Sequence, residues 1–559
     1  MTGDSNAQSG KGQALAPLRE TSFRRIWLAS LLSSLGQFFF AVAVAWEMTR
    51  LSDAPIMIAL VQTAMMLPLT LITLPAGALA DMFDRRKIAM FGLGFSAASA
   101  AVLAVLGFLD ILAPWMLLAS CLFVGTGTAL YLPSWQSSIA EQVSREHLPA
   151  AVGLASMSAN VARSFGPALG GFIILVAGAK SAFALTACFF IPLLIAFFLW
   201  KRQHTPSRLP PERIDRAIAA GARYALHSPV IRTVLIRIVV FALIISPGPA
   251  LAPLVAKKIL GGDALVLGLL LGAQGVGAVI AALFVSYVRR AVDTETAIRL
   301  LTLGSGLSLV TIGFSPSIIV TTMAFFVFGG CYITTLAILN VDIQLSASRW
   351  VVARALSLFS SATFVGLGLG AWLWGMVADA HGIAQAFLGA GIAAIISIGL
   401  GYLLPLRKPA SKDQNEANIG ASPAVTMELT MRSGPIVIEI AYNVDPQDAR
   451  EFYAAILQLQ PVRHRIGGYN WSIARDIADP ATWTERYQCT TWGDYLRMLD
   501  RYSQGDMERQ VRADSFHRPS ETPRTTRRLE RPFGSVRWKA NSFDPKEELV
   551  NYVGPLGTG

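Results

Sequence analysis

Blocks of about 20 mostly apolar residues recur along this chain from near Ile26 to near Pro405. A helix of that length spans the roughly 30 Å hydrocarbon core of a bilayer. Hydrophobic residues make up 53% of the chain and charged residues 15%, whereas a soluble domain carries about 25% charged residues. A soluble fold has no use for so many apolar blocks, so the sequence predicts an all-α membrane protein.

The blocks predict twelve transmembrane helices in two groups of six, separated by the polar and basic residues 201–230. The first block follows a polar lead and is longer than the apolar region of a cleavable signal peptide, so we expect no such peptide. The predicted helices span residues 26–49, 56–80, 88–109, 112–133, 151–178, 182–200, 231–253, 264–288, 295–314, 317–340, 352–378 and 383–405.

The two groups of helices resemble each other in sequence. When the chain is shifted by 204 positions, Gly and Arg residues of the first group meet the same residues in the second. The matches include Arg85-Arg86 with Arg289-Arg290, Ser144-Arg145 with Ser348-Arg349, Gly166 with Gly370, Gly171 with Gly375, and Gly178 with Gly382. An internal repeat of six helices is typical of secondary transporters, which bind their substrate between the repeats near mid-membrane.

Basic residues predict the orientation of the helices. Residues 1–408 hold 28 Lys and Arg against 16 Asp and Glu, and about 22 of the basic residues lie on one side of the predicted helices. Since positively charged loops stay in the cytoplasm, we expect both termini to be cytoplasmic. The basic excess therefore indicates membrane orientation and not nucleic-acid binding.

A charged motif follows the second predicted helix. Residues 77–87 read Gly-Ala-Leu-Ala-Asp-Met-Phe-Asp-Arg-Arg-Lys and include Gly77, Asp81, Arg85 and Arg86. This resembles the signature of the major facilitator superfamily between helices 2 and 3. The resemblance implies a two-bundle fold and a charged cytoplasmic latch that sets the balance between outward- and inward-facing states. The alternative is a plain positive anchor at the membrane surface.

The counterpart of this motif follows the eighth predicted helix. Arg289 and Arg290 are kept, but Val285 stands where Asp81 would be. We therefore expect the second latch to be degenerate.

The fifth predicted helix carries Gly166, Pro167, Gly170 and Gly171. This resembles a G-P-x-x-G-G element of exporters in the superfamily, in which a missing backbone hydrogen bond and close helix packing permit a bend. Generic small-residue packing is the alternative. Within the superfamily, residues 24–405 are similar to the transmembrane secretion effectors, a group that includes the enterobactin exporter. The supporting stretches are residues 74–81, 160–167 and 354–357.

Charged residues inside predicted helices are costly and are often functional. Glu47 is a candidate coupling residue, although it also lies close enough to the helix end to reach the membrane surface. Arg163 is a candidate for binding an anionic substrate group or for pairing with an acid. Asp342 is a further candidate, with a cap or loop contact as the alternative.

Other chemistry is not suggested by the sequence. No Walker A sequence occurs, so we expect an ion gradient, most simply a proton gradient, to supply the energy. The four cysteines show no CxxC or zinc spacing, so we expect no metal site and no cofactor.

A polar linker, residues 406–434, precedes a change of pattern. Residues 435–535 predict a β-α-β-β-α-β fold, and residues 536–559 form a tail. The pattern is similar to ferredoxin-like domains of the antibiotic-biosynthesis monooxygenase type, which pair into dimers. Such a resemblance would allow Tyr453, His464, Asn470 and Trp471 to line a catalytic pocket, but we expect a dimerisation or regulatory module.

These features together predict a proton-coupled exporter of a small amphipathic molecule, such as a drug-like compound or a siderophore, in a bacterial cytoplasmic membrane. Its expected partners are the small-molecule substrate, the proton gradient and the lipid bilayer. Two alternatives stay open at this point: an importer, and a transporter fused to an enzyme that modifies its cargo.

Overall fold

A computed structural model describes residues 16–82, 84–144, 146–200, 223, 227–347, 351–406, 425–427, 429–518 and 523–530. These residues form two compact units. The first holds the described parts of Met1–Ile218, Thr233–Asp342 and Leu356–Leu406, and it contains the long apolar helices. The second holds the described parts of Ala219–Arg232, Ile343–Ala355 and Arg407–Gly559, and it contains a small sheet.

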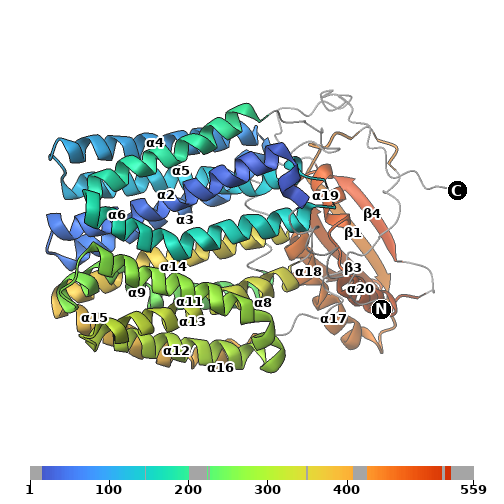
Figure 1. Ribbon diagram of the computed structural model, residues 1–559. Coiled ribbons are helices and arrows are strands. Elements are labelled where there is room, and N and C mark those ends of the chain that lie inside the picture. Colours follow the sequence, from blue (N-terminus) through green and yellow to red (C-terminus); the bar gives the residue numbers. More distant parts are fainter. Residues whose placement is uncertain are drawn as a thin grey trace, which may run out of the picture. The chain divides into compact units, whose positions relative to one another are not determined.

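The first half of the helical unit consists of five long helices that lie together (Figure 1, blue to cyan). Aromatic side chains pack together at one end of these helices, where Phe23, Tyr131, Trp135 and Phe197 belong to one buried cluster. A short 3-10 turn precedes the helices. These elements are η1 (Ala16–Arg19), α2 (Thr21–Leu51), α3 (Pro55–Met82), α4 (Arg85–Phe108), α5 (Pro114–Gln142) and α6 (Leu148–Leu199).

Helix α6 has 52 residues and folds back on itself at Gly178. The backbone there has φ 80° and ψ 164°, a conformation essentially restricted to glycine. Before this point α6 runs parallel to α2, because Trp27 donates to the carbonyl of Leu154 and a Cβ on Gly166 would touch Phe38. After this point it runs antiparallel to α2, because Phe183 packs on Phe40 whereas residue 197 reaches the cluster around residue 23.

The second half of the helical unit (Figure 1, green to yellow) repeats this arrangement. Its last two long helices meet at Gly382, whose φ of 98° and ψ of 162° match the backbone of Gly178. Its elements are α8 (Pro229–Ile245), α9 (Pro247–Ala250), α10 (Ala252–Leu254), η2 (Val255–Ile259), α11 (Ala264–Ala291), α12 (Thr294–Phe314), α13 (Ile318–Ser346), α14 (Val352–His381), α15 (Ile383–Ser397) and α16 (Leu400–Leu403).

The number of membrane crossings agrees with the sequence. Among the described residues, eleven helical segments are long and apolar enough to cross a membrane. One of them is α6, which crosses twice because it folds back at Gly178. The described helices therefore provide the twelve crossings that the sequence predicts.

The seventh crossing differs from the predicted continuous helix over residues 231–253. It breaks after Ile245 into α9, α10 and the π-helical turn η2. Pro247 has no N–H to donate to the carbonyl of Leu243, four residues earlier. That carbonyl instead accepts hydrogen bonds from the indole of Trp374 at 3.0 Å and from the Ser246 hydroxyl at 2.9 Å. Irregular backbone inside a membrane is tolerated where side chains satisfy it in this way.

The second unit contains a four-stranded antiparallel sheet in the order β2-β3-β1-β4. In Figure 1, β1 lies between β3 and β4. This order and the helices between the strands give the predicted ferredoxin-like arrangement, except that each predicted helix is split in two. The elements are β1 (Ile436–Asn443), α17 (Ala449–Leu457), α18 (Leu459–Ile466), β2 (Tyr469–Arg475), β3 (Thr482–Cys489), α19 (Trp492–Leu499), α20 (Gln504–Asp514) and β4 (Arg524–Leu529).

A buried ion pair lies in the core of this second unit. The Arg463 guanidinium donates to both Glu485 oxygens, at 2.9 and 3.0 Å, and both side chains are almost fully buried. Arg463 also donates to Tyr502 and to Gln510, and Trp471 donates to Glu485 at 2.8 Å. Burial opposes the charge on Arg463, but the Glu485 carboxylate, together with Tyr502 and Tyr487, outweighs burial and raises the Arg463 pKa well above its usual value.

Candidate functional site

A cavity of about 470 Å³ lies between the two halves of the helical unit. Volumes of about 300–1,000 Å³ are typical of sites for drug-sized molecules. Its walls come from α2, α3 and α6 in the first half and from α9, α10, α11, α13 and α14 in the second. The apolar lining includes Phe38, Val42, Ile58, Val61, Met65, Met66, Pro167, Pro249, Pro253, Leu271, Ile333, Leu336, Phe364 and Leu367.

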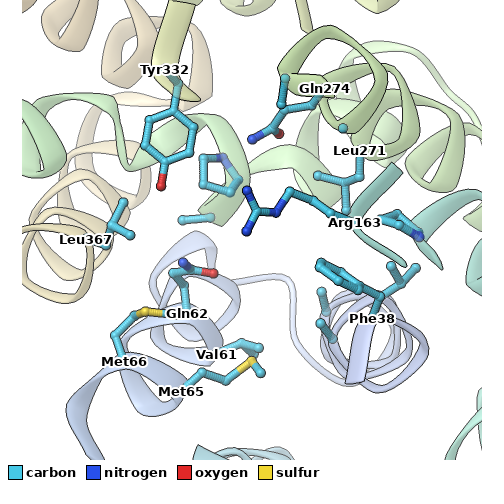
Figure 2. A pocket seen from close by; sticks show the side chains of 18 of the residues that line it. Phe38, Val61, Gln62, Met65, Met66, Arg163, Leu271, Gln274, Tyr332 and Leu367 are labelled. Atoms are coloured by element: carbon cyan, nitrogen blue, oxygen red, sulfur yellow. The ribbon is translucent and has the colours of Figure 1, made fainter. Parts of the chain in front are cut away.

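Polar groups converge in the middle of this cavity. Figure 2 shows the Arg163 guanidinium at its centre, with the polar ends of Gln62, Gln274 and Tyr332 turned toward the same space. Among the described residues that line the cavity, Arg163 is the one with a charged side chain. The sequence predicts this position for Arg163 as one of two alternatives, and the structure places it at the cavity.

The glycine motif on α6 lies where the two halves touch. A Cβ on Gly171 would overlap the carbonyl oxygen of Ala264 on α11, and a Cβ on Gly268 would come within 2.8 Å of the Pro167 carbonyl. Further along, a Cβ on Gly275 would come within 2.5 Å of the Arg163 carbonyl. These glycines therefore allow the backbones of α6 and α11 to meet directly, as in glycine-mediated membrane helix pairs.

The remaining glycines of the motif, Gly166 and Gly170, face α2 instead. A Cβ on Gly166 would press into Phe38, and one on Gly170 would touch Phe39. The motif thus packs α6 against a helix of its own half and against a helix of the other half.

The repeat supplies a second contact between the halves. A Cβ on Gly375 of α14 would come within 2.5 Å of the Ala59 Cβ on α3. In the same helix pair, the Thr63 hydroxyl donates to the carbonyl of Gly368 at 2.9 Å. Gly171 and Gly375 are related by the 204-residue shift, so the contacts of α6 with α11 and of α14 with α3 are equivalent.

Both contacts lie toward the same end of the helical unit. At that end, Lys257 donates to the carbonyl of Thr49, and Lys258 donates to the carbonyl of Asp53 at 3.1 Å. The two halves are therefore joined at the end that carries the α2–α3 connection.

At the opposite end, one arginine of each predicted latch pairs with an acid of its own half. Arg85 lies 3.1 Å from Glu141 at the end of α5, and Arg289 lies 3.6 Å from Asp342 near the end of α13. The sequence predicts a degenerate second latch because Val285 replaces the acid. Arg289 nevertheless has an acidic partner, because Asp342 of another helix lies beside it.

The other residues of the predicted latches lie outside these two ion pairs. Arg86 donates to the carbonyl of Phe198 near the end of α6 and stacks over the Phe198 ring, where a cation is favourable at a helix C-terminus. Arg290 is exposed near the end of α11. Gly77 and Asp81 lie in the last turns of α3, and their side-chain surroundings fall outside the described residues.

Two predicted coupling candidates lie away from the cavity lining. Glu47 is buried near the end of α2 and pairs with Arg50 at 3.1 Å. Asp342 pairs with Arg289, as described above. The structure therefore brings neither carboxylate next to Arg163 in the described lining.

Sequence reasoning missed the partner of a second membrane arginine. Arg237 of α8 is 7% exposed and donates to both oxygens of Glu295, at 2.6 and 3.0 Å. Arg299 and the backbone N–H of Leu406 also bond to Glu295. The network ties α8 to α12 and to the end of the last crossing. The charge on Arg237 was visible in the sequence, but its distant partner was not.

The four tail residues considered for catalysis each have a different contact in the second unit. Trp471 donates to the buried Glu485, Asn470 donates to Gln488 at 2.9 Å, and Tyr453 packs on Trp483. His464 stacks on His227, and burial lowers its pKa. In the described part of the chain, no group of three or more His, Cys, Asp or Glu side chains is arranged to hold a metal ion.

Comparison with protein families gives one match that extends over most of the chain. The sequence model of the family described as "transmembrane secretion effector" matches residues 12–533. The match therefore includes most of the C-terminal domain as well as the helices.

Curated relatives match the chain at lower coverage. The multidrug efflux pump Tap of Mycobacterium tuberculosis is 27% identical over 406 residues, 69% of this chain and 93% of its own. The uncharacterized MFS-type transporter YfiS of Bacillus subtilis is 25% identical, covering 66% and 89%. The staphyloferrin A transporter of Staphylococcus aureus is 22% identical, covering 66% and 92%.

Solved structures agree in fold. A bacterial homologue of the human lysosomal transporter Spinster, inward-facing and occupied, has a TM-score of 0.56 at 13% identity, with 69% of this chain and 97% of that chain covered. A variant of the nucleoside transporter NupG has a TM-score of 0.57 at 10% identity, covering 69% and 100%. At these identities the likeness establishes the two-bundle fold.

Proposed function

Because this chain belongs to the transmembrane secretion effector family of major facilitator superfamily transporters, we propose that it exports a small amphipathic molecule by alternating access, driven by protons. The relatives include one named as a multidrug efflux pump and one named as a staphyloferrin A transporter. A drug-like compound or a siderophore is therefore the proposed class of cargo.

The observation that carries the proposal is a cavity shared by two repeated halves that are joined at one end. The wall is largely apolar and includes Phe38, Met65 and Met66, with a few polar groups at its centre. Such a lining suits an amphipathic molecule better than a sugar or an ion, which would leave the apolar surface in contact with water.

The basic residues of the loops indicate which end of the helical unit faces the cytoplasm in this proposal. If the positively charged connections are cytoplasmic, the end joined by Lys257 and Lys258 faces outward. The state is then inward-facing, ready to take up cargo from the cytoplasm. Both termini and the C-terminal domain are cytoplasmic in this proposal.

Transport requires the two joined contacts to open and the other end to close. Glycine-lined contacts suit this task, because few side chains must rearrange when the backbones separate. The Arg85–Glu141 and Arg289–Asp342 pairs keep the cytoplasmic end of each half together as a rigid body during rocking. The Asp81 side chain is proposed to adjust the balance between the two states, as the family motif implies.

Proton coupling is proposed because the sequence carries no Walker A motif. The acids available in or near the membrane include Glu47, Asp81 and Asp342. A coupling acid need not line the cavity if its protonation changes the balance between states.

The C-terminal domain is proposed as a dimerisation or regulatory module. The buried polar groups around Arg463 and Glu485 bond to one another, which suits a structural core. Counting subunits of the full chain in nanodiscs, with and without residues 425–559, tests dimerisation. A dimer that becomes a monomer on truncation would support it, and a monomer in both samples would contradict it.

The direct test of the transport proposal uses inverted membrane vesicles that contain the full chain. Lipophilic cations and catechol siderophores are offered with and without a proton gradient. We expect gradient-dependent loading that falls more than about tenfold in Asp81→Ala, whereas Asp110→Asn serves as a control at the opposite end. Loading without a gradient would contradict coupling, and substrate accumulation in intact cells would indicate uptake instead.

A further inference from the structure

The single charge of the cavity has no protein counter-ion in the part of the chain that the structure describes. Neither an ion pair nor a hydrogen bond joins Arg163 to another described residue, although its side chain is exposed to the cavity. The Gln274 side-chain oxygen is also without a hydrogen-bond partner among described residues. Membrane arginines with a purely structural role look different, since Arg237 is bonded to both oxygens of Glu295.

The internal repeat shows that the fold does not need a charge at this place. A shift of 204 positions carries Arg163 onto Leu367, which lines the same cavity from α14. The equivalent positions of the two repeats therefore both face the site, one with a charged and one with an apolar side chain. Since Leu367 satisfies the same fold in the second half, the charge on Arg163 serves something other than folding.

An isolated charge in a largely apolar membrane cavity is unfavourable unless water or an opposite charge accompanies it. We propose that the cavity takes an amphipathic anion, whose negatively charged group binds the Arg163 guanidinium. A carboxylate or a sulfonate matches the planar fork of an arginine with two parallel hydrogen bonds. This inference rests on the proposed function, because it names the cargo class of the same site.

The surrounding residues extend this assignment to the rest of the ligand. The amides of Gln62 and Gln274 and the hydroxyl of Tyr332 lie around the guanidinium (Figure 2) and can donate to the remaining lone pairs of the anion's oxygens. The apolar body of the ligand then lies against Phe38 and the methionine side chains of α3, since thioethers adapt to irregular shapes.

The charge count also limits the cargo. One arginine neutralises one negative charge, and the described lining holds no second cation. A ligand with one localised negative group is therefore favoured over a cation, which Arg163 repels, and over a compact polyanion, whose further charges stay unpaired in a poorly hydrated site.

The test measures binding to the full chain in nanodiscs by equilibrium dialysis, with empty nanodiscs as background. The probes are pyrenebutyrate, its neutral amide and the corresponding pyrenebutylamine cation, which share one apolar body. We expect the anion to bind at least tenfold more tightly than the amide and the cation to bind more weakly than the amide. An equal affinity for the three probes, or a preference for the cation, would overturn the proposal.

The repeat provides the matched variants. Arg163→Leu installs the side chain of the equivalent position and is expected to abolish the preference for the anion, so that the anion and the amide bind alike. Binding of the amide shows that the variant is folded. Arg163→Lys is expected to keep most of the preference. Adding Leu367→Arg to Arg163→Leu is expected to restore part of it from the opposite wall.

An unchanged preference for the anion in Arg163→Leu would contradict the assignment. Because binding is measured without transport, its outcome is separate from that of the vesicle experiment. Proton-driven export of cations that is indifferent to Arg163→Leu would overturn the anion assignment and leave the exporter proposal intact. Anion binding without any transport would support the anion assignment and contradict the exporter proposal.

Discussion

The two halves of the helical unit have the same arrangement of helices but carry charged side chains at different positions. Gly178 and Gly382 lie 204 positions apart and reverse the chain with almost the same dihedral angles. The contacts made by Gly171 and Gly375 between the halves are equivalent as well. The repeat is therefore preserved at positions where the backbone conformation admits only glycine, and at positions where two helices approach each other closely.

The charged residues of the cavity and of the buried Arg237–Glu295 pair do not follow the repeat, unlike Arg85 and Arg289. Arg163 faces the cavity, whereas its equivalent is Leu367. The buried Arg237–Glu295 pair exists in the second half alone, because the matching positions hold Ser33 and Phe91. The fold therefore tolerates an uncharged side chain at the equivalent position of the other half. The repeat alone does not explain why Arg163, Arg237 and Glu295 are charged.

The largest effect is expected from breaking the pair that only the second half has. Glu295→Gln leaves the buried Arg237 without a carboxylate, which costs about 3–5 kcal/mol for a buried ion pair. Thermal unfolding followed by tryptophan fluorescence measures the loss. Adding Arg237→Leu to Glu295→Gln removes the uncompensated charge and is expected to recover most of the stability. Comparable loss from Ser33→Ala in the first half would contradict the asymmetry.

A smaller and equal effect is expected at the two chain reversals. Gly178→Ala and Gly382→Ala each force a side chain into a glycine-only backbone conformation, at a cost of about 1–3 kcal/mol. A Cβ at Gly178 meets no atom, and one at Gly382 meets the end of the flexible Gln385 side chain. The unfolding temperatures of the two variants are therefore expected to fall together. A loss in one variant alone would show that the halves are not equivalent here.

The smallest effect is expected at the Arg85–Glu141 and Arg289–Asp342 ion pairs. Each is partly exposed, so Arg85→Ala and Arg289→Ala are expected to reduce stability by up to about 1 kcal/mol. The loss should shrink at high salt, because exposed charges are screened. Exchanging the partners in Arg289→Asp/Asp342→Arg is expected to restore stability. A much larger, salt-independent loss at either arginine would show that these residues do more than pair.

Features that depend on neighbouring residues in the sequence were predicted better than features that depend on contacts between distant residues. The number of crossings, the reversal near Gly178 and the order of elements in the C-terminal domain follow from local patterns of apolar residues and were predicted. The helix ends were less predictable, since α5 and α13 extend nine and six residues beyond their predicted ends at residues 133 and 340. The break in the seventh crossing was missed, although Pro247 and Pro253 were a readable local signal. That break depends in part on Trp374, more than a hundred residues away.

Charge partners were the least predictable part of the site. Arg163 was singled out because a charge inside an apolar block stands out, and the structure places it in the cavity lining. Glu47 stood out equally, yet it pairs with the nearby Arg50 outside the described lining. The acids that meet Arg85 and Arg237 lie more than fifty residues away, and a single sequence contains no signal that connects such pairs.

In the proposed cycle, the two halves separate at their joined end each time a molecule is transported. A reducible thiol cross-link between Asp53→Cys and Lys258→Cys tests this separation, because the parent residues meet across that end; the four native cysteines are replaced by alanine in this variant. We expect the cross-link to form readily and to stop vesicle transport, and we expect reduction to restore transport. Full transport by the cross-linked chain would contradict this separation.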